Sequence, residues 1–168
     1  FGWRVSLSSD GTIVAIGALK NDGNGNDSGE FGVYKYSSGS WAQLGVDING
    51  EAAGDESGSS VSLSSDGTIV AIGARWNDGN GDQSGHVRVY KYSGGSWSKL
   101  GDDIDGEAAD DGSGYSVSLS SDGSIVAIGA PQNDGNGSGS GHVRVYQFSS
   151  GSWIQRGGDI DGEAAGDF

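Results

Sequence analysis

Short stretches in which apolar and polar residues alternate recur along the chain and predict β-strands. In residues 3–8, Val5 and Leu7 fall on one face and serines fall on the other, which is the period of a half-buried strand. Residues 12–18 are apolar at almost every position, so we expect a second strand that is buried on both faces. An Asp-Gly pair at residues 10–11 separates the two stretches and predicts a hairpin turn in which both residues take positive φ.

Two further strands are predicted in the same part of the chain. Residues 31–36 are rich in aromatic and β-branched residues, and a fourth strand begins at Trp41 and fades near Leu44. A polar loop at residues 21–29 precedes the third strand, and an acidic link at residues 47–55 follows the fourth strand. No stretch has the periodicity of a helix. The four short strands therefore predict one antiparallel sheet.

The whole pattern returns with a step of 56 residues, so the expected repeats are residues 1–56, 57–112 and 113–168 of one repeat domain. A period of this size is typical of solenoids, propellers and arrays. We expect an all-β fold of three four-stranded antiparallel blade-like repeats, arranged as a β-propeller or as an open repeat array. Recurring aromatic residues are expected to pack strands and blades together: Trp41, Trp97 and Trp153, with Tyr34, Tyr90 and Tyr146.

Composition sharpens this interpretation. With 34 glycines and 33% hydrophobic residues, a single large core is not expected, and each repeat must share its core with its neighbours. The net charge of -14 argues against nucleic acid, whose phosphates require a basic surface, and against anionic lipid. No apolar run approaches the roughly 20 residues of a membrane span, so no membrane insertion is expected. Cations are the partners that this charge favours.

The residues at two places resemble the FG-GAP repeat of integrin-α-like β-propellers. Residues 1–2 are Phe-Gly, and residues 129–131 are Gly-Ala-Pro at the end of a predicted second strand. The sequence departs from the family pattern where Ser57 and Ser113 replace the phenylalanine, and where Leu19 and Arg75 replace the proline. The resemblance implies blade architecture and an extracellular or cell-surface adhesive role. It also implies a calcium loop between the first two strands, but residues 8–11 are too short to carry one.

A different loop offers oxygen ligands for calcium. Each repeat places Asp, Asn or Ser side chains at positions i, i+2 and i+4 of a glycine-rich segment, which is how a calcium loop opens. The bidentate acid expected further along is replaced by valine, and the same segments also form ordinary turns without an ion. Both interpretations stay open, and calcium is the cofactor to test. The candidate ligands are Asp22, Asn24 and Asn26, then Asp78, Asn80 and Asp82, then Asp134 and Asn136.

The same loops contain two sequons for N-glycosylation, at Asn26 and Asn136.

The sequence gives little support for an enzymatic function. His86 and His142 lie one repeat apart, and their counterpart in the first repeat is Glu30, so they do not form a shared acid–base pair within one sheet. The chain also lacks cysteine and a Gly-x-Ser-x-Gly nucleophile motif, so we predict that the protein is not an enzyme.

Aromatic residues gather where the third repeat would meet the first. Phe168, Phe1 and Trp3 stand at positions that hold mostly small or polar residues at the two internal junctions. Three blades are fewer than the four to eight that close a ring, so the outer sheets should keep uncovered faces. We therefore predict an extracellular structural or adhesive protein that joins its own copies head-to-tail, as a filament or a multi-copy ring, with Phe1, Trp3 and Phe168 at the junction.

The alternative is a calcium-dependent module that binds glycans or surface proteins. Its contact surface would use positions that vary between the repeats, namely Lys20, Trp76 and Gln132. An aromatic ring at such a position can stack on a sugar or anchor an interface.

Overall fold

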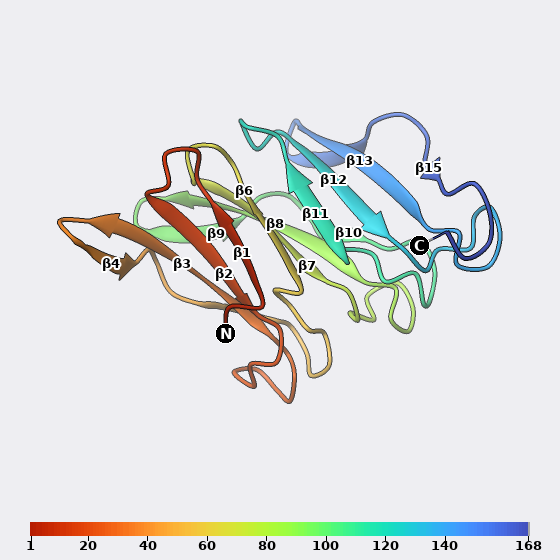
Figure 1. Ribbon diagram of the computed structural model, residues 1–168, viewed down its shortest axis with the longest axis horizontal. Helices are drawn as coiled ribbons and strands as arrows, with labels where there is room; N and C mark the ends of the chain where they lie inside the picture. Colours follow the sequence, from red (N-terminus) through yellow and green to blue (C-terminus); the bar gives the residue numbers. More distant parts are fainter. Residues whose placement is uncertain (168) are drawn as a thin grey trace.

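The computed structural model describes residues 1–167 and consists of three separate β-sheets that lie side by side (Figure 1). Each sheet is made from one repeat, which confirms the expected all-β, blade-like fold. None of the described residues forms a helix long and apolar enough to cross a membrane. Phe168, a predicted junction residue, lies outside the described residues.

The strands have nearly the same bounds in every repeat. The first sheet contains β1 (Arg4–Leu7), β2 (Ile13–Ala18), β3 (Glu30–Ser37), β4 (Ser40–Gln43) and β5 (Ile48–Asn49). The second sheet contains β6 (Ser60–Leu63), β7 (Ile69–Ala74), β8 (His86–Ser93), β9 (Ser96–Lys99) and β10 (Ile104–Asp105). The third sheet contains β11 (Ser116–Leu119), β12 (Ile125–Ala130), β13 (His142–Ser149), β14 (Ser152–Gln155) and β15 (Ile160–Asp161).

Each sheet is an antiparallel meander in which the fourth position is shared by two strands. In the first sheet β1, β2, β3 and β4 pair in order, and β4 pairs with the second half of β3. The short β5 pairs with the beginning of β3, where Phe31 is opposite Ile48. The segment expected to be only an acidic link therefore contributes an edge strand, because its single isoleucine continues the apolar face of the sheet.

The hairpin between β1 and β2 differs from its expected form. Gly11 takes a positive φ of 70°, but Asp10 does not. The Asp10 carboxylate instead accepts hydrogen bonds from the Thr12 amide at 2.9 Å and from the Ser8 hydroxyl at 2.7 Å. Because the side chain closes the turn, only the glycine needs the left-handed conformation.

The core lies between the sheets rather than inside any one of them. The second strand of each sheet alternates its side chains, so in the middle sheet Val70 and Ile72 face the first sheet, while Ala71 faces the third. Burial of this strand on both faces is confirmed in the middle sheet. In β2, Val14 and Ile16 stay half-buried because no sheet covers that face. The first junction buries Ile13, Ala15, Phe31 and Val33 against Leu63, Val70 and Ile72, and the second buries Ala71, Val87, Val89 and Ile104 against Val126 and Ile128.

Candidate functional site

The two outer sheets present apolar faces to solvent. On the first sheet, Phe1, Trp3, Val5 and Leu7 are exposed on or beside β1, and Trp41 is exposed on β4. The Phe1 ring packs edge-on against Tyr34, with 6.2 Å between the ring centroids. The structure thus brings two of the predicted junction residues onto one uncovered face.

The third sheet leaves its opposite face uncovered. Val143, Ile154 and Ile160 are exposed on β13, β14 and β15. Ile160 has 62% of its surface exposed, whereas Ile104, one repeat earlier, has 5% exposed because the third sheet covers it. The uncovered face of the third sheet is therefore the counterpart of the face that the second sheet packs against the third.

The first sheet shows the same difference in exposure between an outer face and its buried counterpart. Leu7 is 59% exposed, and its counterpart Leu63 is 7% exposed against the first sheet. The internal junctions also have a hydrogen bond across the sheets: the Trp97 indole donates to the Leu44 carbonyl and the Trp153 indole donates to the Leu100 carbonyl, each at 2.7 Å. The two uncovered faces are thus the two complementary halves of an internal junction.

The predicted calcium loops are held by hydrogen bonds to the chain itself. The Asp22 carboxylate accepts a hydrogen bond from the Asp27 amide, and the Asn24 side-chain amide donates to the carbonyls of Gly50 and Glu51. The later loops repeat the scheme, with Asp78 accepting from the Gln83 amide and Asp134 from the Gly139 amide. The aspartate contacts close each loop on itself, and the contacts of Asn24, Asn80 and Asn136 tie each loop to the following link. Calcium binding at Asp22, Asn24, Asn26, Asp78, Asn80, Asp82, Asp134 and Asn136 stays a prediction.

The two sequon asparagines, Asn26 and Asn136, are exposed on these loops. The Asn136 side-chain nitrogen, to which a glycan would be attached, donates to the carbonyls of Gly162 and Glu163, whereas the Asn26 side-chain nitrogen donates only to the Asp27 carboxylate, at 3.3 Å. Glycosylation at both positions stays a prediction.

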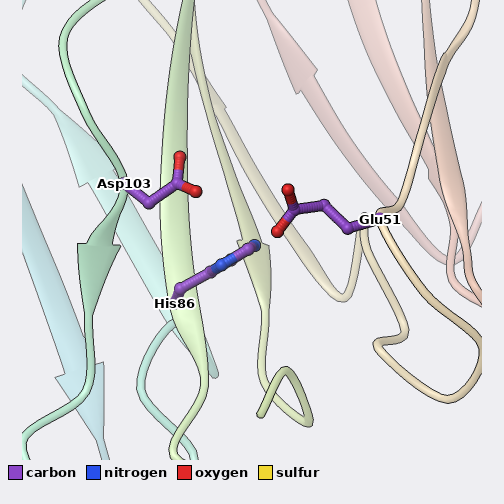
Figure 2. Close-up of side chains that lie close together, drawn as sticks. All are labelled: Glu51, His86 and Asp103. Carbon is purple, nitrogen blue, oxygen red and sulfur yellow. The ribbon is translucent and has the colours of Figure 1, made fainter. Parts of the chain in front are cut away.

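A cluster of charged residues lies at each internal junction, around a buried histidine. At the first junction, His86 at the start of β8 points between Glu51, from the link, and Asp103, from the segment before β10 (Figure 2). Arg88 donates to both carboxylates of Asp103 and Glu51, with 3.0 Å from its Nε to Asp103 Oδ1. At the second junction Glu107, His142, Arg144 and Asp159 repeat the arrangement.

Burial and ion pairing oppose one another in these clusters. Burial lowers the pKa of His86, and the neighbouring Arg88 charge lowers it further. Burial also disfavours the charged Arg88 guanidinium, but the hydrogen bonds that it donates to Asp103 and Glu51 outweigh burial and raise its pKa. The same hydrogen bonds from Arg88 and Lys99 outweigh burial at Asp103 and lower its pKa. Around His86, burial and the Arg88 charge thus disfavour the protonated imidazole, while the hydrogen bonds from Arg88 and Lys99 favour the charged form of Asp103.

Sequence analysis identified the histidines but missed the partners that surround them. The signal was present in the 56-residue step, because His and Arg occur together in the second and third repeats. The first repeat replaces both of them, with Glu30 and Gly32. A pair of residues that appears and disappears together indicates side chains that share one environment.

A groove of about 690 Å³ lies beside the second junction, on the side of the glycine-rich loops. Its lining includes Trp76, Tyr115 and Gln132, together with Asp110 and Asp134. The Arg75 guanidinium stacks on the Trp76 ring, 4.9 Å from its centroid. Two of the varying positions named from the sequence thus lie in one aromatic and polar groove.

The fold resembles solved β-propeller-like structures of remote sequence. A candidate 6-phosphogluconolactonase from Bacteroides uniformis superposes with a TM-score of 0.65 at 14% identity, over 95% of this chain and 40% of that one. The periplasmic gluconolactonase of Pseudomonas aeruginosa gives a TM-score of 0.55 at 15% identity, over 92% of this chain and 44% of that one. This chain therefore spans less than half the length of either neighbour, and at such low identity the likeness concerns the fold alone.

Sequence comparison supports the same architecture. A comparison with curated protein sequences gave no match. Residues 49–90, from the first acidic link through the middle of β8, match the profile of the FG-GAP repeat. With three blade-like sheets in the structure, this match confirms the resemblance to the FG-GAP repeat over residues 49–90.

Proposed function

We propose that this chain is a non-enzymatic structural module that joins to further copies of itself, head-to-tail, through its two uncovered sheet faces. The observation that carries the proposal is the complementarity of these faces. The face around Leu7 is the counterpart of the buried face around Leu63, and the face around Ile160 is the counterpart of the buried face around Ile104. One copy can therefore repeat, with the next copy, the packing that already joins its own sheets.

The size of the module supports an assembly larger than one chain. The chain covers 40% and 44% of the neighbouring propeller-like chains. Two copies joined in this way would supply a number of blades within the range of about four to eight that closes a ring. If the rotation at the junction does not close, the same contact gives a filament.

An extracellular or surface location fits the proposal. The FG-GAP match and the resemblance to integrin-α-like propellers support it, since such repeats are typical of adhesive surface proteins. The Pseudomonas neighbour is described as periplasmic, which agrees with a place outside the cytosol for this fold.

The assembly is tested with one variant on each face. Leu7→Asp blocks the face of the first sheet, and Ile160→Asp blocks the face of the third sheet. Light scattering should show concentration-dependent oligomers for the parent chain and monomers for either variant alone. An equimolar mixture of the two variants should give a dimer, because each retains one working face.

A control variant, Val46→Asp, changes an exposed apolar residue in the loop between β4 and β5 and should assemble like the parent. A parent chain that stays monomeric at every concentration contradicts the proposal. A mixture that gives no dimer shows that the contact is not head-to-tail.

The groove at Trp76 favours a second candidate function, binding of a glycan. Trp76 and Tyr115 offer aromatic surface, and Gln132, Asp110 and Asp134 offer hydrogen-bonding groups. Retention on immobilised glycans, lost in Trp76→Ala and kept in Trp41→Ala, would support it. Retention that both variants keep would reject the groove as the site.

A further inference from the structure

His142 has a buried ring nitrogen that no hydrogen bond satisfies. Its side chain is 4% exposed, and Nδ1 is the one buried side-chain nitrogen or oxygen atom in residues 1–167 that lacks a hydrogen-bond partner. A buried polar atom normally finds a partner, because an unpaired one loses the hydrogen bonds that it would make with water. The site around His142 is therefore incomplete as it stands.

Two carboxylates face this nitrogen at a distance that suits a shared ion. Glu107 Oε2 is 3.7 Å from Nδ1, and Asp159 Oδ2 is 4.0 Å from it. Both distances are too long for a hydrogen bond. Ligands of a four-coordinate zinc ion, bonded at about 2.0–2.2 Å, lie roughly 3.3–3.5 Å from one another. The three ligand groups lie within 4.8 Å of one another, so they would have to move closer together to share one metal ion.

Arg144 holds the carboxylates and leaves ligand atoms open. It donates from Nε to Asp159 Oδ1 and from Nη2 to Asp159 Oδ2, both at 2.9 Å, and its contact with Glu107 goes to Oε1. Glu107 Oε2 and the second lone pair of Asp159 Oδ2 thus stay available. Glu107, Asp159 and Arg144 together carry one net negative formal charge, which favours an added cation. Hydrogen bonds from a second residue commonly orient carboxylates that bind a metal.

The donor set selects the class of metal. Imidazole nitrogen with two carboxylates suits zinc and similar divalent transition metals, whereas calcium takes oxygen ligands alone. The same set recurs at the first junction, where His86 lies between Glu51 and Asp103 with their ligand atoms within 4.8 Å of one another (Figure 2).

We propose that each internal junction is a binding site for a divalent transition metal of the zinc type, held by Glu107, His142 and Asp159 and by Glu51, His86 and Asp103. In each site the glutamate comes from the link that enters the blade, and the other two ligands come from the blade itself. The metal would therefore fasten the link to the blade that follows it. The fourth position on the metal would be open to water.

The first repeat provides an internal comparison. Glu30 and Gly32 stand there in place of histidine and arginine, so the proposal assigns no such site to the first sheet. The expected number of metal sites is therefore two for three repeats. The proposal does not depend on assembly, because both sites lie within a single chain.

Calorimetric titration of the metal-free full chain with ZnCl₂ tests the number of sites. We expect two ions per chain for the parent, one for His142→Ala, one for His86→Ala and none above background for the double variant. CoCl₂ should give a visible absorption band of a four- or five-coordinate ion, and the band should fall by half in each single variant. Parent stoichiometry near zero, or full stoichiometry in the double variant, would overturn the proposal.

Glu107→Gln covers the case in which a histidine variant fails to fold, because Glu107 is exposed and its replacement keeps the side-chain shape. We expect at least a tenfold loss of zinc affinity at that site. The matched control is Glu163→Gln, at the counterpart position in the third repeat, which belongs to neither proposed site. Equal losses of zinc affinity for the two variants would contradict metal binding at this site.

Discussion

Trp41 and Trp97 occupy the same place in their repeats, yet they meet different surroundings. Trp97 packs against the first sheet and donates its indole hydrogen bond to the Leu44 carbonyl. Trp41 packs on Tyr36 in its own sheet, with 5.3 Å between the ring centroids, and stays exposed. The difference shows that a residue of this repeat becomes part of a core only when another sheet covers it. The contribution of such a residue to stability therefore depends on the neighbouring sheet as much as on the residue itself.

The sharpest way to break this comparison is to remove each tryptophan in turn. Trp97→Ala should lower the free energy of unfolding by about 3 kcal/mol, because it loses buried aromatic surface and a hydrogen bond between sheets. Trp41→Ala should lower it by less than about 1 kcal/mol. Chemical denaturation of dilute protein measures both. Similar losses for the two variants would mean that the first sheet is covered in solution.

A glycine pair offers the next largest contrast. A Cβ added at Gly73 would collide with the Gly114 carbonyl of the following repeat, whereas at Gly129 its nearest neighbour is the Ser116 side-chain hydroxyl, which can rotate away. Gly73→Ala should therefore cost about 1–3 kcal/mol through overpacking, and Gly129→Ala clearly less. Thermal unfolding of the two variants decides the matter. If Gly129→Ala is the more harmful change, close approach between sheets is not what requires glycine here.

Removing an arginine should have a smaller effect. Arg88→Met leaves Asp103 and Glu51 without their shared cation, and we expect a loss of about 1 kcal/mol because both carboxylates are partly exposed to solvent. The loss should shrink as salt is added, since screening weakens the pair in the parent. Denaturation in EDTA at two salt concentrations provides the measurement. A loss that does not change with salt would point to packing of the side chain instead.

The smallest effect on stability is expected at the turn after β11, where the hydrogen bonds lie within one sheet and do not depend on a neighbouring sheet. Hydrogen bonds from Ser120 and Ser124 lower the pKa of Asp122 from 3.8 to about 2 in the folded chain. The charged carboxylate is therefore favoured by folding above pH 4, and this contribution is lost as the pH falls from 4 towards 2. Asp122→Asn should make unfolding midpoints less dependent on pH in this range. An unchanged pH profile would show that the turn does not stabilise the charged form.

Much of the fold could be predicted from the chain because its signals are local. The period-two pattern around Val5 and the apolar run at residues 12–18 located strands to within one or two residues. β5 was missed because two paired residues are too short to produce a period. The φ of Asp10 was wrong because its side chain, rather than its backbone, closes the turn.

The candidate site was harder to foresee because its members come from separate segments. Glu107 lies in a link, His142 begins a strand and Asp159 precedes another, so only the stacking of sheets brings them together. The junction residues followed from the sequence more directly, since Phe1 and Trp3 break a pattern that is otherwise strict. The face of the sheet on which they lie could be assigned only from the register between β1 and β2.

The turns between the first two strands of each sheet are joined by a row of backbone hydrogen bonds. The Ser9 amide donates to the Ser65 carbonyl, and the Ser65 amide donates to the Ser121 carbonyl, each at 2.8 Å. Every unit therefore brings one donor for the unit after it and one acceptor for the unit before it. Such a row can be lengthened by gene duplication without inventing a new contact, so the number of units is free to change during evolution while the step between them stays constant.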